Sequence, residues 1–143
     1  MATSSKEKSE LVAAAARVKH NAYAIYSNFR VGAALLTDEG DIFEGCNVEN
    51  ASYGLTICAE RNAVFQAVAE GKKRFRAIAI SSDDVGFITP CGACRQVLAE
   101  FTPRLEIILT NKAGKMKITS LDKLFPIPPD LKKLSRIKIK PKK

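Results

Sequence analysis

Two short cysteine motifs constrain the fold of this chain more than any other feature of its sequence. The first is Cys58-Ala59-Glu60, and the second is Pro90-Cys91-Gly92-Ala93-Cys94. Each motif opens a segment with helical character, which predicts helices over 58–70 and 91–100. Cysteines at the starts of two helices are suited to share one metal ion, and a shared ion requires the two helix starts to lie side by side.

The rest of the chain alternates between helical and strand-like patterns. Residues 5–26 carry apolar side chains at helical spacing, and Ser4 or Ser5 is placed to cap that helix. Apolar runs between turn residues predict five strands, at 29–36, 42–46, 77–81, 105–110 and 116–119. One helix, a hairpin and then alternating helices and strands predict the α/β class, specifically a three-layer α/β/α sandwich with a mixed five-stranded sheet. We expect one domain over residues 1–130 and a basic C-terminal tail over 131–143.

The net charge of +8 comes almost entirely from that tail. Residues 131–143 hold seven Lys and Arg and no acidic residue, so removing their seven charges leaves +1 for residues 1–130. Such a tail can bind phosphate nonspecifically, direct the protein to the nucleus or remain simply solvated. Because the domain itself is nearly neutral, we do not expect nucleic acid to be its main partner, although the tail leaves that reading open.

The sequence shows no sign of membrane insertion or secretion. It has no apolar run of the roughly 18 to 20 residues that a membrane helix needs. Its N-terminus lacks the basic and then apolar segment of a secretory signal. We therefore expect no membrane partner and a cytoplasmic location, or a nuclear one if the tail directs it there. In the cytoplasm, cysteines serve as free thiols or metal ligands more often than as disulfides.

Three cysteines are the candidate zinc ligands: Cys58, Cys91 and Cys94. Three protein ligands leave a fourth position for water, as in catalytic zinc sites, whereas a fourth cysteine closes a structural site. Cys46 could be that fourth ligand, but its place at a strand end favours a small buried side chain. Three thiolates give the zinc site a net charge of −1, which two helix N-termini and a donor such as Arg61 can offset. Glu60 is two residues from Cys58, and such residues point about 200° apart on a helix, so both reach one metal only if Cys58 precedes the regular helix.

Taken together, these motifs resemble those of the cytidine deaminases, specifically the small homotetrameric class with three cysteine ligands. The likeness runs from about residue 11 to 125. It is densest in Tyr26-Ser27-Asn28-Phe29-Arg30-Val31-Gly32-Ala33, in Gly45-Cys46-Asn47-Val48-Glu49-Asn50-Ala51-Ser52-Tyr53 and in the two cysteine motifs. The resemblance implies a homotetramer with one zinc ion per subunit. It also implies hydrolytic deamination of cytidine, and of 2′-deoxycytidine, to uridine or deoxyuridine with release of ammonia, in pyrimidine salvage.

The resemblance also assigns roles to single residues. Glu60 corresponds to the carboxylate that moves protons in zinc deaminases. Phe29 corresponds to the aromatic residue on the pyrimidine ring, and Asn47 and Glu49 to the pair that hydrogen-bonds the ribose 3′-hydroxyl. The other implied substrate contacts are Ala51, Tyr53 and the backbone N–H of Ala59.

Two features depart from the family. Its members often end with Leu-Pro-x-x-Phe, whose phenylalanine reaches an adjacent active site, whereas this chain has Pro129 at that position. Completion of the site by a neighbouring subunit therefore stays open. The basic tail is the second departure.

Three other functions each fit part of the sequence. A deaminase acting on a base within RNA would use the basic tail, and a thiol–disulfide oxidoreductase would use Cys91 and Cys94. A non-catalytic zinc module would use Cys46 as a fourth ligand. The oxidoreductase leaves Cys58-Ala59-Glu60 unexplained. Zinc content and an assay of cytidine loss distinguish these functions.

Overall fold

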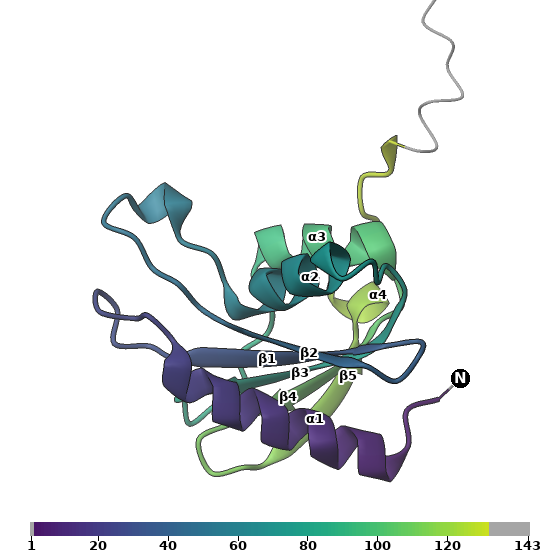
Figure 1. The fold of residues 1–143 in the computed structure, drawn as a ribbon, viewed down its shortest axis with the longest axis horizontal. Coiled ribbons are helices and arrows are strands. Elements are labelled where there is room, and N and C mark those ends of the chain that lie inside the picture. The colour runs from purple at the N-terminus through teal and green to yellow at the C-terminus, as the bar shows by residue number, and fades with distance from the viewer. Residues whose placement is uncertain (1, 132–143) are drawn as a thin grey trace, which may run out of the picture.

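The computed structural model describes residues 2–131 as three layers, with a five-stranded sheet in the middle (Figure 1). Helix α1 (Ser5–Val18) covers one face of the sheet. Helices α2 (Ala59–Ala69) and α3 (Gly92–Phe101) cover the other face, together with the short α4 (Leu121–Leu124). The strands are β1 (Val31–Thr37), β2 (Ile42–Cys46), β3 (Phe75–Ser82), β4 (Glu106–Thr110) and β5 (Met116–Ser120). The predicted three-layer α/β/α fold is confirmed.

The order of the strands brings the two cysteine motifs together. The sheet runs β2-β1-β3-β4-β5, with β3 and β4 parallel and the other neighbouring pairs antiparallel. Parallel neighbours need a crossover connection, which α3 supplies between β3 and β4. Helix α2 leads into β3 and α3 leads out of it, so the two helices pack next to each other on one face.

The core consists of two apolar clusters, one on each face of the sheet. Successive side chains of a strand point to opposite faces. On β1, Ala33 and Leu35 accordingly pack with α2 and α3, and Ala34 and Leu36 pack with α1. All four side chains are buried. Strand β1 is therefore free of charged side chains and buried along its whole length, because helices cover both of its faces.

Helix α1 begins as predicted and ends earlier than predicted. Ser4 caps it, and Glu7 completes a capping box by accepting the Ser4 backbone N–H. The predicted end at residue 26 is wrong: the helix stops at Val18, and a 3₁₀ turn (η1, Lys19–Asn21) follows. Tyr23 then bonds through its backbone to residues 47 and 49. These long-range hydrogen bonds replace the helical ones that the apolar spacing suggested.

The remaining elements begin and end within two residues of their predicted bounds. Two short elements were not predicted, α4 and a 3₁₀ turn before α2 (η2, Tyr53–Leu55), because single turns show no periodicity. Of the predicted tail, 131–143, all but Leu131 lies outside the described residues. None of the helices in residues 2–131 has the length and apolar character needed to cross a bilayer.

Candidate metal centre and substrate cavity

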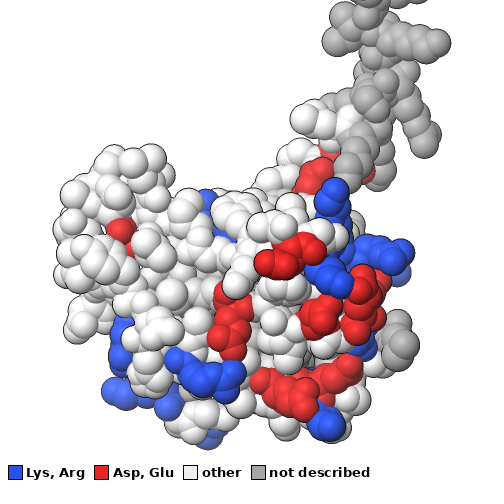
Figure 2. All heavy atoms as spheres, viewed as in Figure 1, with Lys and Arg blue, Asp and Glu red and all other residues white. Residues whose placement is uncertain are grey.

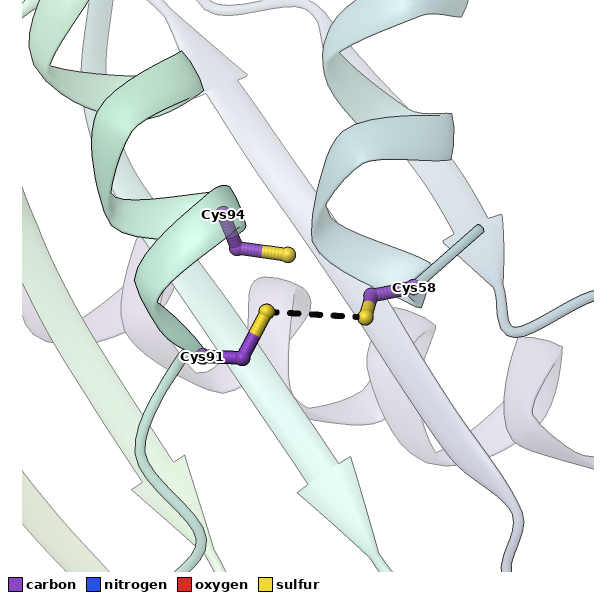
Figure 3. A group of neighbouring side chains, drawn as sticks. All are labelled: Cys58, Cys91 and Cys94. Carbon is purple, nitrogen blue, oxygen red and sulfur yellow. Dashed lines mark hydrogen bonds between the residues drawn. The ribbon is translucent and has the colours of Figure 1, made fainter. Parts of the chain in front are cut away.

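The sulfur atoms of Cys58, Cys91 and Cys94 converge between the starts of α2 and α3 (Figure 3). All three lie within 4.8 Å of one another, and the Cys58 and Cys91 sulfurs are 3.8 Å apart. Tetrahedral zinc with Zn–S distances of about 2.3 Å places its sulfur ligands about 3.8 Å apart. The cluster therefore fits one zinc ion held by three cysteines.

Two of these cysteines stand at helix N-caps. Cys58 precedes α2 with φ −70° and ψ 157°, and Cys91 precedes α3 with φ −65° and ψ 170°, so both have extended backbone. Neither side chain caps its helix by a hydrogen bond. The N–H groups and positive dipole ends of two helices are thus directed toward the sulfurs, where they stabilise thiolate charge.

The extended conformation of Cys58 also brings Glu60 to the cluster. Cys58 is outside the regular helix, so the 200° separation expected within a helix does not apply. Cys94 Sγ donates a hydrogen bond to Glu60 Oε2 at 3.1 Å. Glu60 is 4% exposed, and this burial raises the pKa of its carboxyl.

The thiols of Cys58 and Cys94 ionise differently. The pKa of Cys58 falls to about 5, because Cys94, Arg61 and Cys91 hydrogen-bond to its sulfur and outweigh its partial burial. The pKa of Cys94 is raised, first by its hydrogen bond to Cys58 and then by burial and the nearby Glu60 carboxylate. The thiolate of the metal-free site is therefore centred on Cys58.

Arg61 is the cation of the cluster. Its Nη2 donates to Cys58 Sγ at 3.5 Å, and this bond is the main reason that the pKa of Arg61 is raised. Its Nε is buried and has no hydrogen-bond partner among the described residues. A partly buried guanidinium with one unused donor fits a site where three thiolate sulfurs lie together.

A cavity of about 240 Å³ opens beside the sulfurs. Predicted site residues on its wall are Phe29, Asn47, Glu49, Cys58, Ala59, Glu60 and Cys91. Asn47 Oδ1 accepts the Val31 N–H at 2.9 Å, and its Nδ2 donates to Phe29 O at 2.8 Å. Glu49 accepts hydrogen bonds from the backbone of Tyr26 and from both the backbone and the side chain of Ser27. The two polar side chains thus hold the segment that presents Phe29.

Two predicted substrate contacts lie away from this cavity. Ala51 is exposed and lines neither it nor the neighbouring hollow. Tyr53 is 78% exposed and lines that hollow, a second cavity of about 410 Å³ that shares Glu49 with the first. Cys46 is outside the sulfur cluster; its carbonyl accepts a hydrogen bond from Asn62.

Sequence reasoning missed several wall residues. Ile88 and Thr89 line the cavity from the segment before α3, and Thr56 lines it from the segment before α2. The signal for them was their position: each lies within three residues of a metal-binding cysteine, so it had to lie near the same centre.

Comparison with known proteins agrees with this geometry. Residues 5–110 match the cytidine and deoxycytidylate deaminase zinc-binding region. The chain belongs to this deaminase family. A cytidine deaminase of Sporosarcina psychrophila is 47% identical over 118 residues, which cover 82% of this chain and 87% of that protein. The cytidine deaminase of Halalkalibacterium halodurans is 44% identical over 121 residues, 84% of this chain and 92% of that protein.

Solved structures of deaminases share the fold. The crystal structure of cytidine deaminase from Burkholderia pseudomallei has a TM-score of 0.81 and 52% sequence identity, covering 85% of this chain and 98% of that one. The predicted resemblance, enzyme class and zinc cofactor are thereby confirmed. The oxidoreductase and the four-cysteine zinc module do not fit, since Cys58 joins the cluster and Cys46 lies outside it.

Proposed function

We propose that this deaminase hydrolyses free cytidine and 2′-deoxycytidine to uridine and deoxyuridine, with release of ammonia. The observation that carries the proposal is the buried Glu60 carboxylate, which contacts Cys94 Sγ and lines the same cavity as Phe29. A small, mostly apolar cavity beside three metal-binding sulfurs suits a flat pyrimidine ring.

Glu60 is the proton carrier in this proposal. When bound, zinc supplies a water molecule whose pKa is lowered toward neutrality. With zinc bound, Glu60 would accept a proton from this water as its oxygen adds to C4 of the ring, and would donate that proton to N3. Glu60 would then take the remaining proton of the added oxygen and pass it to the amino group at C4, so that the C4–N bond breaks and ammonia leaves. Burial raises the pKa of Glu60, which suits a carboxyl group that both accepts and donates near neutral pH.

The cavity wall supplies groups for the rest of the nucleoside. Phe29 offers an apolar face to the ring, and the Ala59 N–H lies in the first turn of α2, where backbone donors lack helical partners. Asn47 retains one amide hydrogen beyond its two bonds to the protein, and Glu49 retains lone pairs. A ribose hydroxyl both donates and accepts, so it matches this pair.

A nucleoside fits the cavity better than a nucleotide does. The family includes deaminases of both cytidine and deoxycytidylate. A 5′-phosphate needs cationic or N–H donors. Among the described residues that line the two adjoining cavities none is Lys or Arg, and the charged ones are Glu49 and Glu60. These carboxylates repel phosphate, which supports a free nucleoside as substrate.

We also propose that the protein works as a homotetramer in pyrimidine salvage, in the cytoplasm. Large apolar side chains are exposed around η2 and the segment beside it: Ile25, Tyr26, Tyr53 and Leu55. Figure 2 shows few charges on the lobe that holds η2 in Figure 1. Exposed apolar side chains of this kind support an interface with another subunit. Ala51 and Tyr53 would then contact that subunit.

The three thiols support the proposed cytoplasmic location, because metal-binding cysteines must stay reduced and the cytoplasm is a reducing compartment. Residues 1–130 are the proposed catalytic unit.

The substitution Glu60→Gln tests the proposed function. Glutamine keeps the shape of the side chain but does not carry protons, so zinc content should stay at one per chain while kcat falls by on the order of 10²–10⁴-fold. Glu44→Gln on β2, outside both cavities, is the control and should leave turnover unchanged. Cytidine loss is followed by ultraviolet absorbance and zinc by elemental analysis. A Glu60→Gln enzyme with most of its activity would overturn the assignment.

A further inference from the structure

The segment that leads into Cys91 is held in an unusual way. Residues 83–90 connect β3 to Cys91, and their second part, 86–90, has no helix or strand structure. Among the hydrogen bonds of residues 2–131, no backbone–backbone bond involves residues 86–90. The two hydrogen bonds that reach this segment both come from the Arg95 side chain: Nε donates to Pro90 O at 2.8 Å, and Nη2 donates to Thr89 Oγ1 at 3.1 Å.

The third nitrogen of the same guanidinium is anchored elsewhere. Arg95 Nη1 donates to Leu124 O at 2.8 Å, at the end of α4. Helix α4 is itself fixed, because Leu121 is fully buried in the core and its N–H bonds to Leu105 O. Arg95 lies directly after Cys94 in α3. The planar guanidinium of Arg95 therefore connects the 86–90 segment both to α3, which carries Arg95, and to the end of α4.

This segment decides where one ligand and one wall of the cavity lie. Cys91 follows Pro90 directly and is exposed, so little packing restrains it. Ile88 and Thr89 line the cavity. We propose that Arg95 is a positioning residue of the metal centre. It holds residues 89 and 90 against α3 and α4, so that Cys91 Sγ stays close enough to the other two sulfurs to bind the same metal ion. No hydrogen bond joins Arg95 to those sulfurs among the described residues. The inference rests on the proposed zinc-dependent function.

The test compares two arginines with similar surroundings and different partners. Arg95→Met removes all three donors and keeps an apolar stem, and Arg95→Lys keeps one donor. Arg76→Met is the matched control, because Arg76 is also partly buried and also donates from three nitrogens, to Thr37 O and to the Glu7 carboxylate. The readouts are the rate of zinc release to a chromogenic chelator, thermal unfolding of the zinc-free proteins, and kcat and KM for cytidine.

We expect zinc release from Arg95→Met to be about tenfold or more faster than from Arg76→Met, although both lose thermal stability. Arg95→Lys should lie between wild type and Arg95→Met, and KM for cytidine should rise in both as the Thr89 wall shifts. If Arg95→Met does not fold, Arg95→Lys and Thr89→Val carry the comparison, since each removes only part of the contact.

Two results would overturn the inference. One is zinc release and KM at wild-type values in the Arg95 variants; the other is equally fast zinc release from Arg76→Met, which would make the effect one of general stability. A wild-type protein that binds no zinc or does not deaminate cytidine would instead refute the proposed function, so the two failures are distinguishable.

Discussion

Replacing Gly45 with alanine is expected to impair catalysis more than folding. Gly45 lies on β2, and a Cβ atom added to it meets Ala59 O and Ala63 N of α2 at 2.4 Å each. A Cβ atom essentially never lies within 3.0 Å of another heavy atom outside its own residue and chain neighbours. Both obstructing atoms belong to the backbone, so no side-chain rotation relieves the overlap. The first turns of α2 must move away from the sheet by about 1 Å.

That displacement falls on the part of α2 that carries the chemistry. Cys58 is its N-cap and Glu60 lies in its first turn. A misplacement of about 1 Å can cost on the order of 10²-fold in rate, whereas overpacking a core costs about 1–3 kcal/mol of stability. We therefore expect Gly45→Ala to fold cooperatively, with kcat for cytidine lowered by on the order of 10²-fold.

Gly32→Ala is the matched control on the opposite face. A Cβ atom there meets Ala15 O of α1 at 2.1 Å, so the strain falls on the helix away from the metal centre. Urea unfolding measures stability and ultraviolet absorbance measures turnover of the folded protein. The control should lose at least as much stability yet keep kcat within about threefold, because α1 does not touch the site. Equal loss of kcat in both variants, or wild-type kcat in Gly45→Ala, would refute the reasoning.

Three further experiments probe the sulfur cluster. Arg61→Met removes a donor to Cys58 Sγ, so zinc should transfer to a chelator about tenfold faster, and an unchanged rate would contradict the role of Arg61. Because the pKa of Cys58 is about 5 and that of Cys94 is raised, zinc binding at pH 7 displaces a proton from Cys94 but not from Cys58. The ultraviolet absorbance of the Cys58 thiolate in the metal-free protein should be present at pH 7 and should be lost as the pH falls through about 5; an absorbance that does not change across this range would contradict the ionisation of Cys58. Cys46→Ser should keep one zinc per chain and full turnover, and loss of zinc in elemental analysis would make Cys46 a ligand.

The metal centre was predictable because its ligands lie at places that local sequence marks clearly. Cys58 and Cys91 precede apolar periodic segments, so both were expected at helix starts, and helix starts stabilise anionic ligands. The one difficulty, that Glu60 points away from Cys58 on a helix, was settled by the extended backbone of Cys58. Local sequence does not specify an N-cap to within one residue, so that point required the structure.

The substrate side was less predictable, because long-range contacts build it. The helical spacing of residues 5–26 could not reveal that Tyr23 bonds to the 47–49 segment, which ends the helix early. Nor could it reveal that Asn47 clamps the backbone around Phe29. Asn47 and Glu49 were expected as ribose contacts, but their partners in the structure give them a second task, that of holding the loop which carries the aromatic wall.

The charge of the cluster explains why a three-cysteine site needs so much surrounding structure. Zinc with three thiolates carries a net negative charge, which weakens the acidity of its water relative to a site with a neutral histidine. In this chain two helix N-termini face the sulfurs, and Arg61 donates a hydrogen bond to Cys58 Sγ. Each withdraws charge from sulfur and so restores part of the lost acidity. The pKa of Cys58 is lowered before any metal binds, first by its hydrogen bond with Cys94 and then by Arg61. Arg61 therefore both prepares the site for zinc and withdraws charge from it once zinc is bound.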